Sequence, residues 1–150
     1  VDMGVEPYLV ASSLEAVLAQ RLVRVLCKHC KQPDNSPAAT AFKAQVGIPA
    51  STTIYRSVGC RECRNTGFHG RHAVFEWMDS DNEIRKLILD NASSDVIRET
   101  ARRAGMRTLA EDGWRIVSLG ITTVEEVLSV TTAKEVARTQ QKQPEPAATA

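Results

Sequence analysis

Four cysteines in two matching pairs carry the clearest chemical signal in this sequence. They lie in "LCKHC", at Cys27 and Cys30, and in "GCRECRNTG", at Cys60 and Cys63. Two residues between cysteines allow a tight turn to aim both sulfurs at one ion, and two such turns supply the closed four-thiolate set of structural zinc sites. We therefore expect these cysteines to bind one structural zinc ion. A closed set leaves no open position for catalysis.

The residues around the cysteines fit such a site. Glycines next to the second pair can adopt the positive φ values that tight turns need, and these are Gly59, Gly67 and Gly70. Basic side chains beside both pairs would offset the negative charge of a zinc–thiolate centre and keep the thiols deprotonated. These are Lys28, Lys31, Arg61 and Arg64, for which coincidental surface charge is the alternative interpretation.

Other uses of the cysteines stay open, namely a redox dithiol, an iron–sulfur centre or a site that is never metallated. His29, His69 and His72 could also bind a metal, but four cysteines already fill the coordination shell. No P-loop, G-x-S-x-G, H-E-x-x-H or G-x-G-x-x-G motif is present. The sequence thus predicts no catalytic and no cofactor-binding residue, and Glu76, Glu111 and Asp112 are explained by capping or surface roles.

The composition is that of an ordinary soluble protein. The formal net charge of the 150 residues is +1, which gives no reason to expect a polyanion partner for the whole chain. Residues 27–78 are mildly basic and residues 79–132 mildly acidic. No apolar run is long enough to span a membrane and no secretory signal is visible, which favours metal or free thiols over disulfides. The chain starts without Met, and we expect it to be a piece of a longer protein.

Hydrophobic periodicity predicts one helix over residues 6–26, with an apolar stripe from Leu14 to Val25. A short helix is expected after Ser36 and Pro37, ending at Gly47. The segments 52–58 and 71–78 are rich in strand formers and predict a hairpin-like unit around the second cysteine pair.

Helical periodicity continues after Met78. Capping boxes begin at Ser80, Thr108 and Thr122, and a further helix begins at about Ser94. Gly113 lies on an apolar helix face, where it would allow a neighbouring segment to come close. These four helices predict a compact bundle, whereas residues 133–150 lack periodicity and predict a disordered tail.

The predicted fold is therefore α+β and mainly α-helical. Its expected parts are a helix over residues 1–26, a zinc-binding subdomain with short strands over residues 27–78, a helical subdomain over residues 79–132 and the tail over residues 133–150.

Several separated segments resemble one known family. "GVEPYLVASSLEAVLAQRLVRVLCKHC", "GCRECRNTGFHGRHAVFE", "AGMRTLAEDGW" and "GITTVEEVLSVT" are similar to the C-terminal portion of secretion motor ATPases, over roughly residues 1–132. These are the type II secretion ATPase (general secretion pathway protein E) and its type IV pilus assembly relatives. Departures at Lys28, at Phe68–Arg71 and at Ala73–Val74 leave the subfamily open, although "AEDGW" and "EEVLSVT" favour type II secretion.

The resemblance implies a hexameric, cytoplasmic ATPase at the inner membrane. Its RecA-like core and its ATP and magnesium site would lie before Val1, so this chain alone would not be catalytic. The first helix would end the ATPase core, and the cysteines match the family's tetracysteine zinc motif. Implied partners are the other subunits of the hexamer and inner-membrane platform proteins of pseudopilin or pilin assembly, with no nucleic acid.

In the "QRLVR" run, Gln20, Arg21 and Arg24 are candidates for contact with nucleotide or a neighbouring subunit, with a charged helix edge as the alternative. Two other functions compete with the motor segment. One is a free-standing zinc-ribbon module that binds nucleic acid or protein, although aromatic side chains that could stack on bases are few. The other is a thiol oxidoreductase.

Overall fold

The computed structural model describes residues 4–131, and the predicted tail over residues 133–150 lies outside this range. Within it the chain forms helices and two-stranded sheets, which confirms the expected α+β class. The described residues divide into two compact units. Unit 1 contains the residues up to Gln20 and Phe75–Thr108, and unit 2 contains Arg21–Val74 and the residues from Leu109. No helix among residues 4–131 is both long and apolar enough to cross a membrane.

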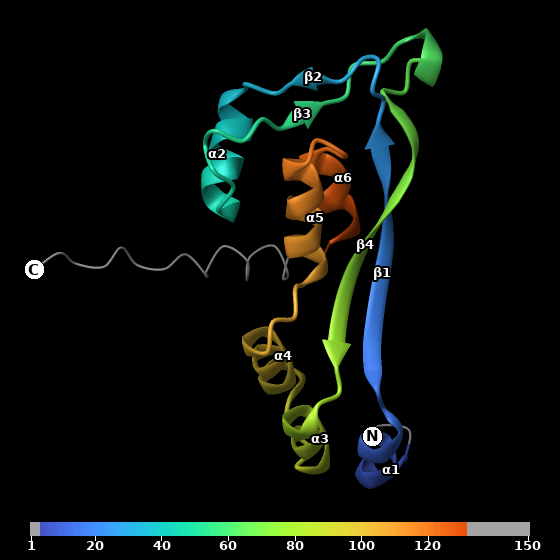
Figure 1. Ribbon diagram of the computed structural model, residues 1–150, viewed down its shortest axis with the longest axis vertical. Coiled ribbons are helices and arrows are strands. Elements are labelled where there is room, and N and C mark those ends of the chain that lie inside the picture. The colour runs from blue at the N-terminus through green and yellow to red at the C-terminus, as the bar shows by residue number, and fades with distance from the viewer. Residues whose placement is uncertain (1–3, 132–150) are drawn as a thin grey trace, which may run out of the picture. The chain divides into compact units, whose positions relative to one another are not determined.

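Helix α1 (Pro7–Ser13) is followed by strand β1 (Ala16–Leu26), so the helix predicted over residues 6–26 is wrong beyond its second turn. The backbone leaves the helix at Leu14, which is extended, and continues as a long strand. β1 pairs with β4 (Phe68–Asp79), and the two strands run in opposite directions (Figure 1). Each of these two strands has residues in both units, since the division falls after Gln20 in β1 and before Phe75 in β4.

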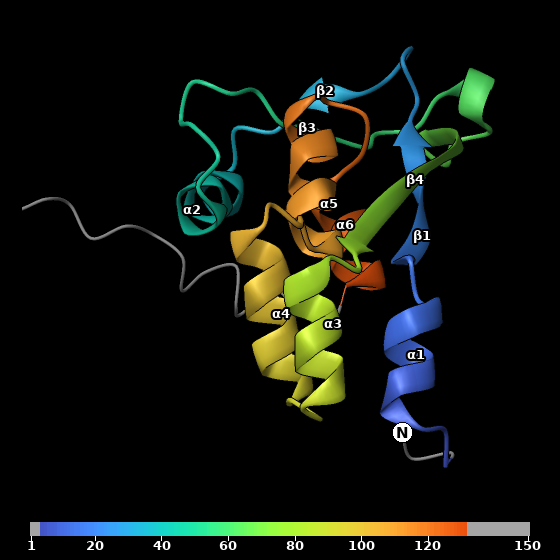
Figure 2. The same cartoon turned by 60° about the horizontal axis from the view of Figure 1, so that its bottom comes forward.

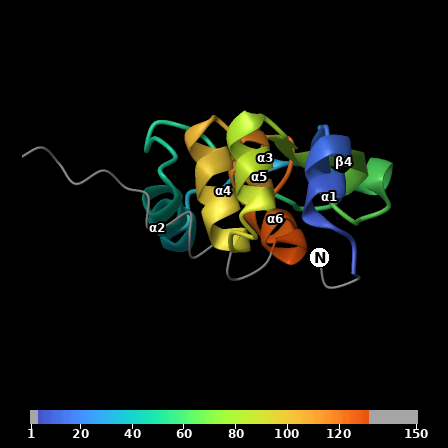
Figure 3. The same cartoon turned by 90° about the horizontal axis from the view of Figure 1, so that it is seen from below.

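In unit 1, α3 (Asn82–Leu89) lies between α1 and α4 (Ser94–Arg103), as Figures 2 and 3 both show. The side chain of Asp81 caps α3 by accepting a hydrogen bond from the N–H of Ile84, so the capping box predicted at Ser80 is displaced by one residue. Ser93 caps α4 in the same way. Few large side chains are buried in this unit, and Ile84 is the most enclosed of them.

Unit 2 contains α2 (Pro37–Val46), α5 (Leu109–Ser118) and α6 (Val124–Val130). The predicted limits of α2 are confirmed, because Ser36 caps its first turn and Gly47 ends it with a φ of 75°. α6 is capped by Thr123, one residue after the predicted Thr122. The core of the unit brings together seven buried side chains from these helices and the loop after α2: Ala39, Ile48, Ile54, Ala110, Trp114, Val117 and Val127.

The predicted hairpin around the second cysteine pair is wrong. Strand β3 (Tyr55–Arg56) pairs with β2 (Gln32–Pro33), with Gln32 opposite Arg56 and Pro33 opposite Tyr55. Each strand pair therefore joins a segment next to the first cysteine pair with one next to the second (Figure 1). This nested pairing, with β2 and β3 between β1 and β4 along the chain, brings the two cysteine turns together.

The four C-terminal helices are confirmed as elements, but α3 and α4 belong to unit 1 and α5 and α6 to unit 2. The predicted subdomain boundaries after residues 26, 78 and 132 stay a prediction. Gly113 fulfils its predicted role, because α6 packs against it: a Cβ at this position would overlap the side chain of Val127.

Gly113→Ala should destabilise the protein by about 1–3 kcal/mol, because the added methyl group overpacks the contact between α5 and α6. Denaturant unfolding measures this free energy. In a Val127→Ala background the same change should cost much less, because both γ carbons of Val127 are gone, only the Cβ of residue 127 stays near the added methyl group, at 3.3 Å, and alanine favours the helix. An equal cost in both backgrounds would show that the contact with Val127 is not the cause.

Candidate metal centre

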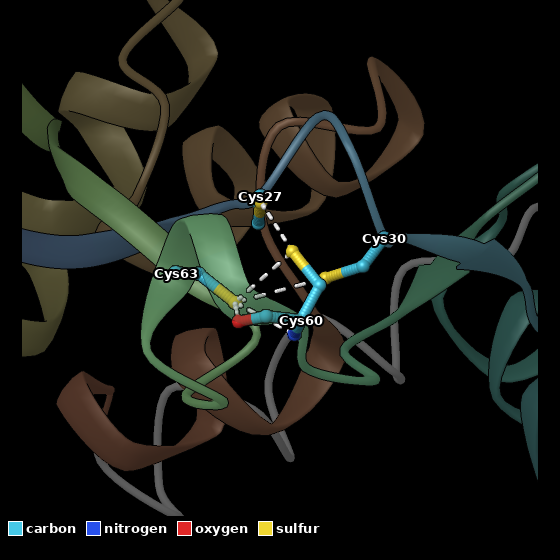
Figure 4. Close-up of side chains that lie close together, drawn as sticks. All are labelled: Cys27, Cys30, Cys60 and Cys63. Carbon is cyan, nitrogen blue, oxygen red and sulfur yellow. Dashed lines mark hydrogen bonds between the residues drawn. The ribbon is translucent and has the colours of Figure 1, made fainter.

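The sulfur atoms of Cys27, Cys30, Cys60 and Cys63 all lie within 4.8 Å of one another (Figure 4). Residues far apart in the sequence thus meet at one point, as the sequence predicts. Among residues 4–131 this is the only group of three or more His, Cys, Asp or Glu side chains placed to hold a metal ion. His29, His69 and His72, which the sequence left only as less favoured alternatives to the cysteines, are not part of this group.

Three of the sulfur–sulfur separations have the length expected between ligands of one metal ion. Cys27 and Cys60 are 3.9 Å apart, Cys30 and Cys63 are 3.8 Å apart, and Cys60 and Cys63 are 3.7 Å apart. A regular tetrahedron with Zn–S bonds of about 2.3 Å has edges of about 3.8 Å. A disulfide needs about 2.05 Å, and all four cysteines are free thiols. The cluster therefore fits a metal ion with four thiolate ligands.

The first knuckle (Cys27–Cys30) follows β1 directly. The carbonyl of Cys27 accepts hydrogen bonds from the N–H groups of Cys30, at 3.3 Å, and Lys31, at 3.0 Å, which close a tight turn. The N–H of Cys27 donates to the carbonyl of Gly67 at 2.9 Å. This bond joins the first knuckle to the chain that leaves the second.

The second knuckle (Cys60–Cys63) is a 3₁₀ turn over Arg61–Cys63, followed by Arg64 and Asn65 with φ values of 52° and 62°. Glycines close it on both sides. Gly59 has a φ of 112°, and an added Cβ would lie 2.8 Å from the carbonyl oxygen of Asn65. Gly67 has a φ of 79°, and an added Cβ would lie 2.7 Å from the Cβ of Ser57. Both glycines are therefore needed for conformation and for space.

Backbone N–H groups point at the sulfurs of Cys30 and Cys63 and bring partial positive charge to them. The N–H groups of Cys60 and Gly67 donate to Sγ of Cys63 at 3.1 Å and 3.2 Å, and the N–H of Gly59 donates to Sγ of Cys30 at 3.3 Å. Such bonds favour the thiolate form and orient a metal ligand. Of the basic residues expected to serve this purpose, Lys31 instead donates to the carbonyl of Gly120 at 2.8 Å. The contribution of Lys28, Arg61 and Arg64 stays a prediction.

The surroundings shift the pKa values of Cys63 and Cys30 in opposite directions. Burial raises the pKa of Cys63. The N–H groups of Cys60 and Gly67 and the thiols of Cys60 and Cys30 together lower it by more, and the resulting pKa is about 6. Burial, together with the neighbouring thiols, raises the pKa of Cys30 to about 11 against the opposing effect of the Gly59 N–H. Without a metal the thiolate form is thus favoured at Cys63 and opposed at Cys30. A cation that binds all four sulfurs has to displace the remaining protons.

Next to the cluster lies a cavity of about 350 Å³. Its lining includes the side chains of Lys28, His29, Glu62 and His69. These polar groups are neighbours of the cysteines and not members of the sulfur cluster.

Arg24, one of the three residues in the "QRLVR" run, is held within unit 2. Its guanidinium pairs with Glu126 at 2.5 Å and lies 4.1 Å from the ring centre of Phe68. The hydrogen bond from Arg24 lowers the pKa of Glu126, against a smaller opposing effect of burial. Gln20 and Arg21 lie on a strand and not on a helix edge, and their predicted contact with nucleotide or a neighbouring subunit stays a prediction.

Known proteins resemble this chain over most of its length. A family model described as "Type II/IV secretion system protein" matches residues 1–129. "Type II secretion system protein HxcR" and "Type II secretion system protein E" of Pseudomonas aeruginosa are each 44% identical over 131 residues, which cover 87% of this chain and 24% and 26% of theirs. "Type IV pilus assembly ATPase PilB" of Thermus thermophilus is 43% identical over 133 residues, which cover 87% of this chain and 15% of its own. The chain thus spans about a quarter or less of these relatives.

Gly59→Ala should weaken zinc binding, because the methyl group would push against the carbonyl of Asn65 and open the second knuckle. Gly70→Ala is the matched control, since Gly70 has a φ of 80° but no atom within 4 Å of an added Cβ. Both variants carry backbone strain of about 1 kcal/mol, but only Gly59→Ala should lose zinc faster to a chelator. Equal loss from both would mean that strain alone matters.

In the reduced, metal-free protein one thiol should ionise near pH 6. Because the pKa of Cys63 is below its ordinary value, its thiolate stabilises the fold at high pH, and this contribution is lost as the pH falls through about 6. Ultraviolet absorbance of the thiolate measures the step, which Cys63→Ser should abolish. A titration without any thiolate below the ordinary cysteine range would contradict the assignment.

Proposed function

The chain belongs to the type II/IV secretion system protein family, and from this membership we propose that it is the C-terminal segment of a secretion or pilus motor ATPase. Its role in the motor is structural, and one zinc ion held by Cys27, Cys30, Cys60 and Cys63 fixes its fold. Relatives named for type II secretion and for type IV pilus assembly match with nearly equal identity, so the proposal covers both systems.

The sulfur geometry carries the zinc assignment. The separations of 3.7, 3.8 and 3.9 Å agree with the edges of a zinc–thiolate tetrahedron. Soft thiolate ligands in a tetrahedral set favour zinc over magnesium or calcium, which prefer oxygen. Four protein ligands leave no open coordination position for substrate or water. The metal therefore acts on the fold and not on a reaction.

The remaining parts of the proposal concern the parent protein. ATP and magnesium bind outside this chain, which contains no P-loop. The parent protein is a cytoplasmic hexamer at the inner membrane, where it drives pseudopilin or pilin assembly through platform proteins. The expected divisions after residues 26, 78 and 132 separate its core connection, zinc subdomain and helical subdomain. Family membership supports this role over a free-standing nucleic-acid module or a thiol oxidoreductase.

Cys60→Ala in the parent protein tests the role of the metal. Removal of one ligand from a closed four-thiolate set should reduce zinc from one ion per chain to almost none, because three ligands hold the ion far more weakly. ATP hydrolysis and secretion or pilus assembly should fall with it. Elemental analysis and the hydrolysis rate are the two measurements.

Glu62→Ala is the control, because Glu62 lies in the same turn, is exposed and contributes no sulfur. It should retain both zinc and activity. Full motor activity in a Cys60→Ala protein that has lost its zinc would reject the structural role, and wild-type protein without zinc would reject the metal itself.

A further inference from the structure

The turn between α5 and α6 (Gly120–Thr123, the α5–α6 turn) is bonded to both ends of the first knuckle. Before the knuckle, the N–H of Leu26 donates to the carbonyl of Ile121 at 2.8 Å, and the hydroxyl of Thr122 donates to the carbonyl of Arg24 at 2.8 Å. After the knuckle, Nζ of Lys31 donates to the carbonyl of Gly120 at 2.8 Å. Three bonds thus attach the turn to residues that flank Cys27 and Cys30.

Lys31 is positioned for this bond from two sides. Its Nζ lies 4.5 Å from the centre of the Tyr55 ring, which favours a cation at that place. Gly120 has a φ of 67°, and an added Cβ would come within 2.8 Å of the Tyr55 ring and 3.3 Å of Nζ. The absence of a side chain at Gly120 therefore allows the turn to approach Lys31 and Tyr55.

A second contact holds the start of α6. Glu126 accepts from the backbone N–H of Arg24 at 3.0 Å and from its guanidinium, which lies over Phe68. Phe68 directly follows Gly67, whose carbonyl accepts from the N–H of Cys27. The first turn of α6 is thus attached to Arg24, which precedes the first knuckle, and Arg24 in turn contacts Phe68, which follows the second.

We infer that Lys31 and the α5–α6 turn couple metal binding at the four cysteines to the packing of α5 and α6. The inference rests on the metal ion of the proposed function. The knuckle sets the position of Lys31, since the N–H of Lys31 donates to the carbonyl of Cys27. When the metal leaves, the knuckle loses its fixed geometry, and the carbonyl of Gly120 loses its partner.

Coupling of this kind is reciprocal. If metal binding strengthens the attachment of the α5–α6 turn by a given factor, loss of the attachment weakens metal binding by the same factor. A change in the helices would therefore alter the metal affinity of cysteines that the helices do not provide. Lys31 acts here as a positioning residue and not as a ligand.

Lys31→Met in the complete chain tests the coupling from the side of the knuckle. It should lower the zinc affinity about fivefold or more, measured by competition with a chelator, and speed amide hydrogen exchange in residues 119–131. Lys28→Met is the control, because it removes the same charge from the same knuckle at an exposed side chain that lines the cavity. Both variants lose one positive charge beside the thiolates, so Lys28→Met should lose clearly less zinc affinity than Lys31→Met and should leave amide exchange in residues 119–131 as in the wild type.

Thr122→Val tests the coupling from the helical side. Thr122 is fully buried and its hydroxyl bonds to Arg24, so this variant should also release zinc more easily although Thr122 is no ligand. Thr40→Val is the control, since it removes a similar hydroxyl-to-carbonyl bond, to Ser36, in α2. Tryptophan fluorescence shows that each variant stays folded during the measurement.

The possible failures differ. If the wild type binds zinc and both Lys31→Met and Thr122→Val retain its zinc affinity, the coupling is wrong and the structural zinc is unaffected. Equal losses in the two lysine variants also overturn it, because charge alone would then explain them. Wild type without zinc overturns the coupling together with the proposed metal.

Discussion

Four sulfur atoms within 4.8 Å of one another cannot all be ionised without a cation among them. Two unit charges about 4 Å apart repel by about 4 kcal/mol at an effective dielectric constant of about 20, and four thiolates form six such pairs. Neutral thiols avoid the repulsion but make weak hydrogen bonds. The approach of the two knuckles, and with it the nested pairing of β1 with β4 and of β2 with β3, depends on how this charge is balanced.

Backbone N–H groups contribute to that balance of charge. N–H groups of Gly59, Cys60 and Gly67 point at sulfur, and the positive φ values around the second knuckle are what turn them inward. Lysine and arginine beside the cysteines looked like natural counterions in the sequence. Lys31, however, contacts Gly120 and Tyr55, because its long side chain reaches past the cluster to the α5–α6 turn.

Elements that depend on neighbouring residues could be predicted from the sequence, whereas elements that depend on a distant partner could not. The limits of α2 follow from Ser36, Pro37 and Gly47, all of which act within one turn. The stripe from Leu14 to Val25 fits a helix, yet Ala16–Leu26 forms a strand because Phe68–Asp79, far along the chain, pairs with it. Its β-branched residues were a signal for strand that the helical spacing concealed.

The candidate site was the most predictable part, since the cysteine spacing alone indicates which atoms converge. The caps of α3 and α6 lie one residue later than the capping boxes suggested, because Asp81 and Thr123 also carry capping side chains. Which residues attach the knuckle to α6 could not be predicted. Arg24 and Glu126 are 102 positions apart, and although each lies in a segment that resembles the family, nothing in the local sequence pairs the two.

The distance along the chain between Cys27 and Cys60 has an entropic consequence. They are 33 positions apart, so an ion that holds both closes a large loop and removes many conformations from the unfolded chain. For a covalent cross-link over a loop of this length the chain-entropy model gives about 4 kcal/mol. A metal cross-link of the same span would restrict the unfolded state in the same way, with the difference that a chelator can open it without any redox reaction.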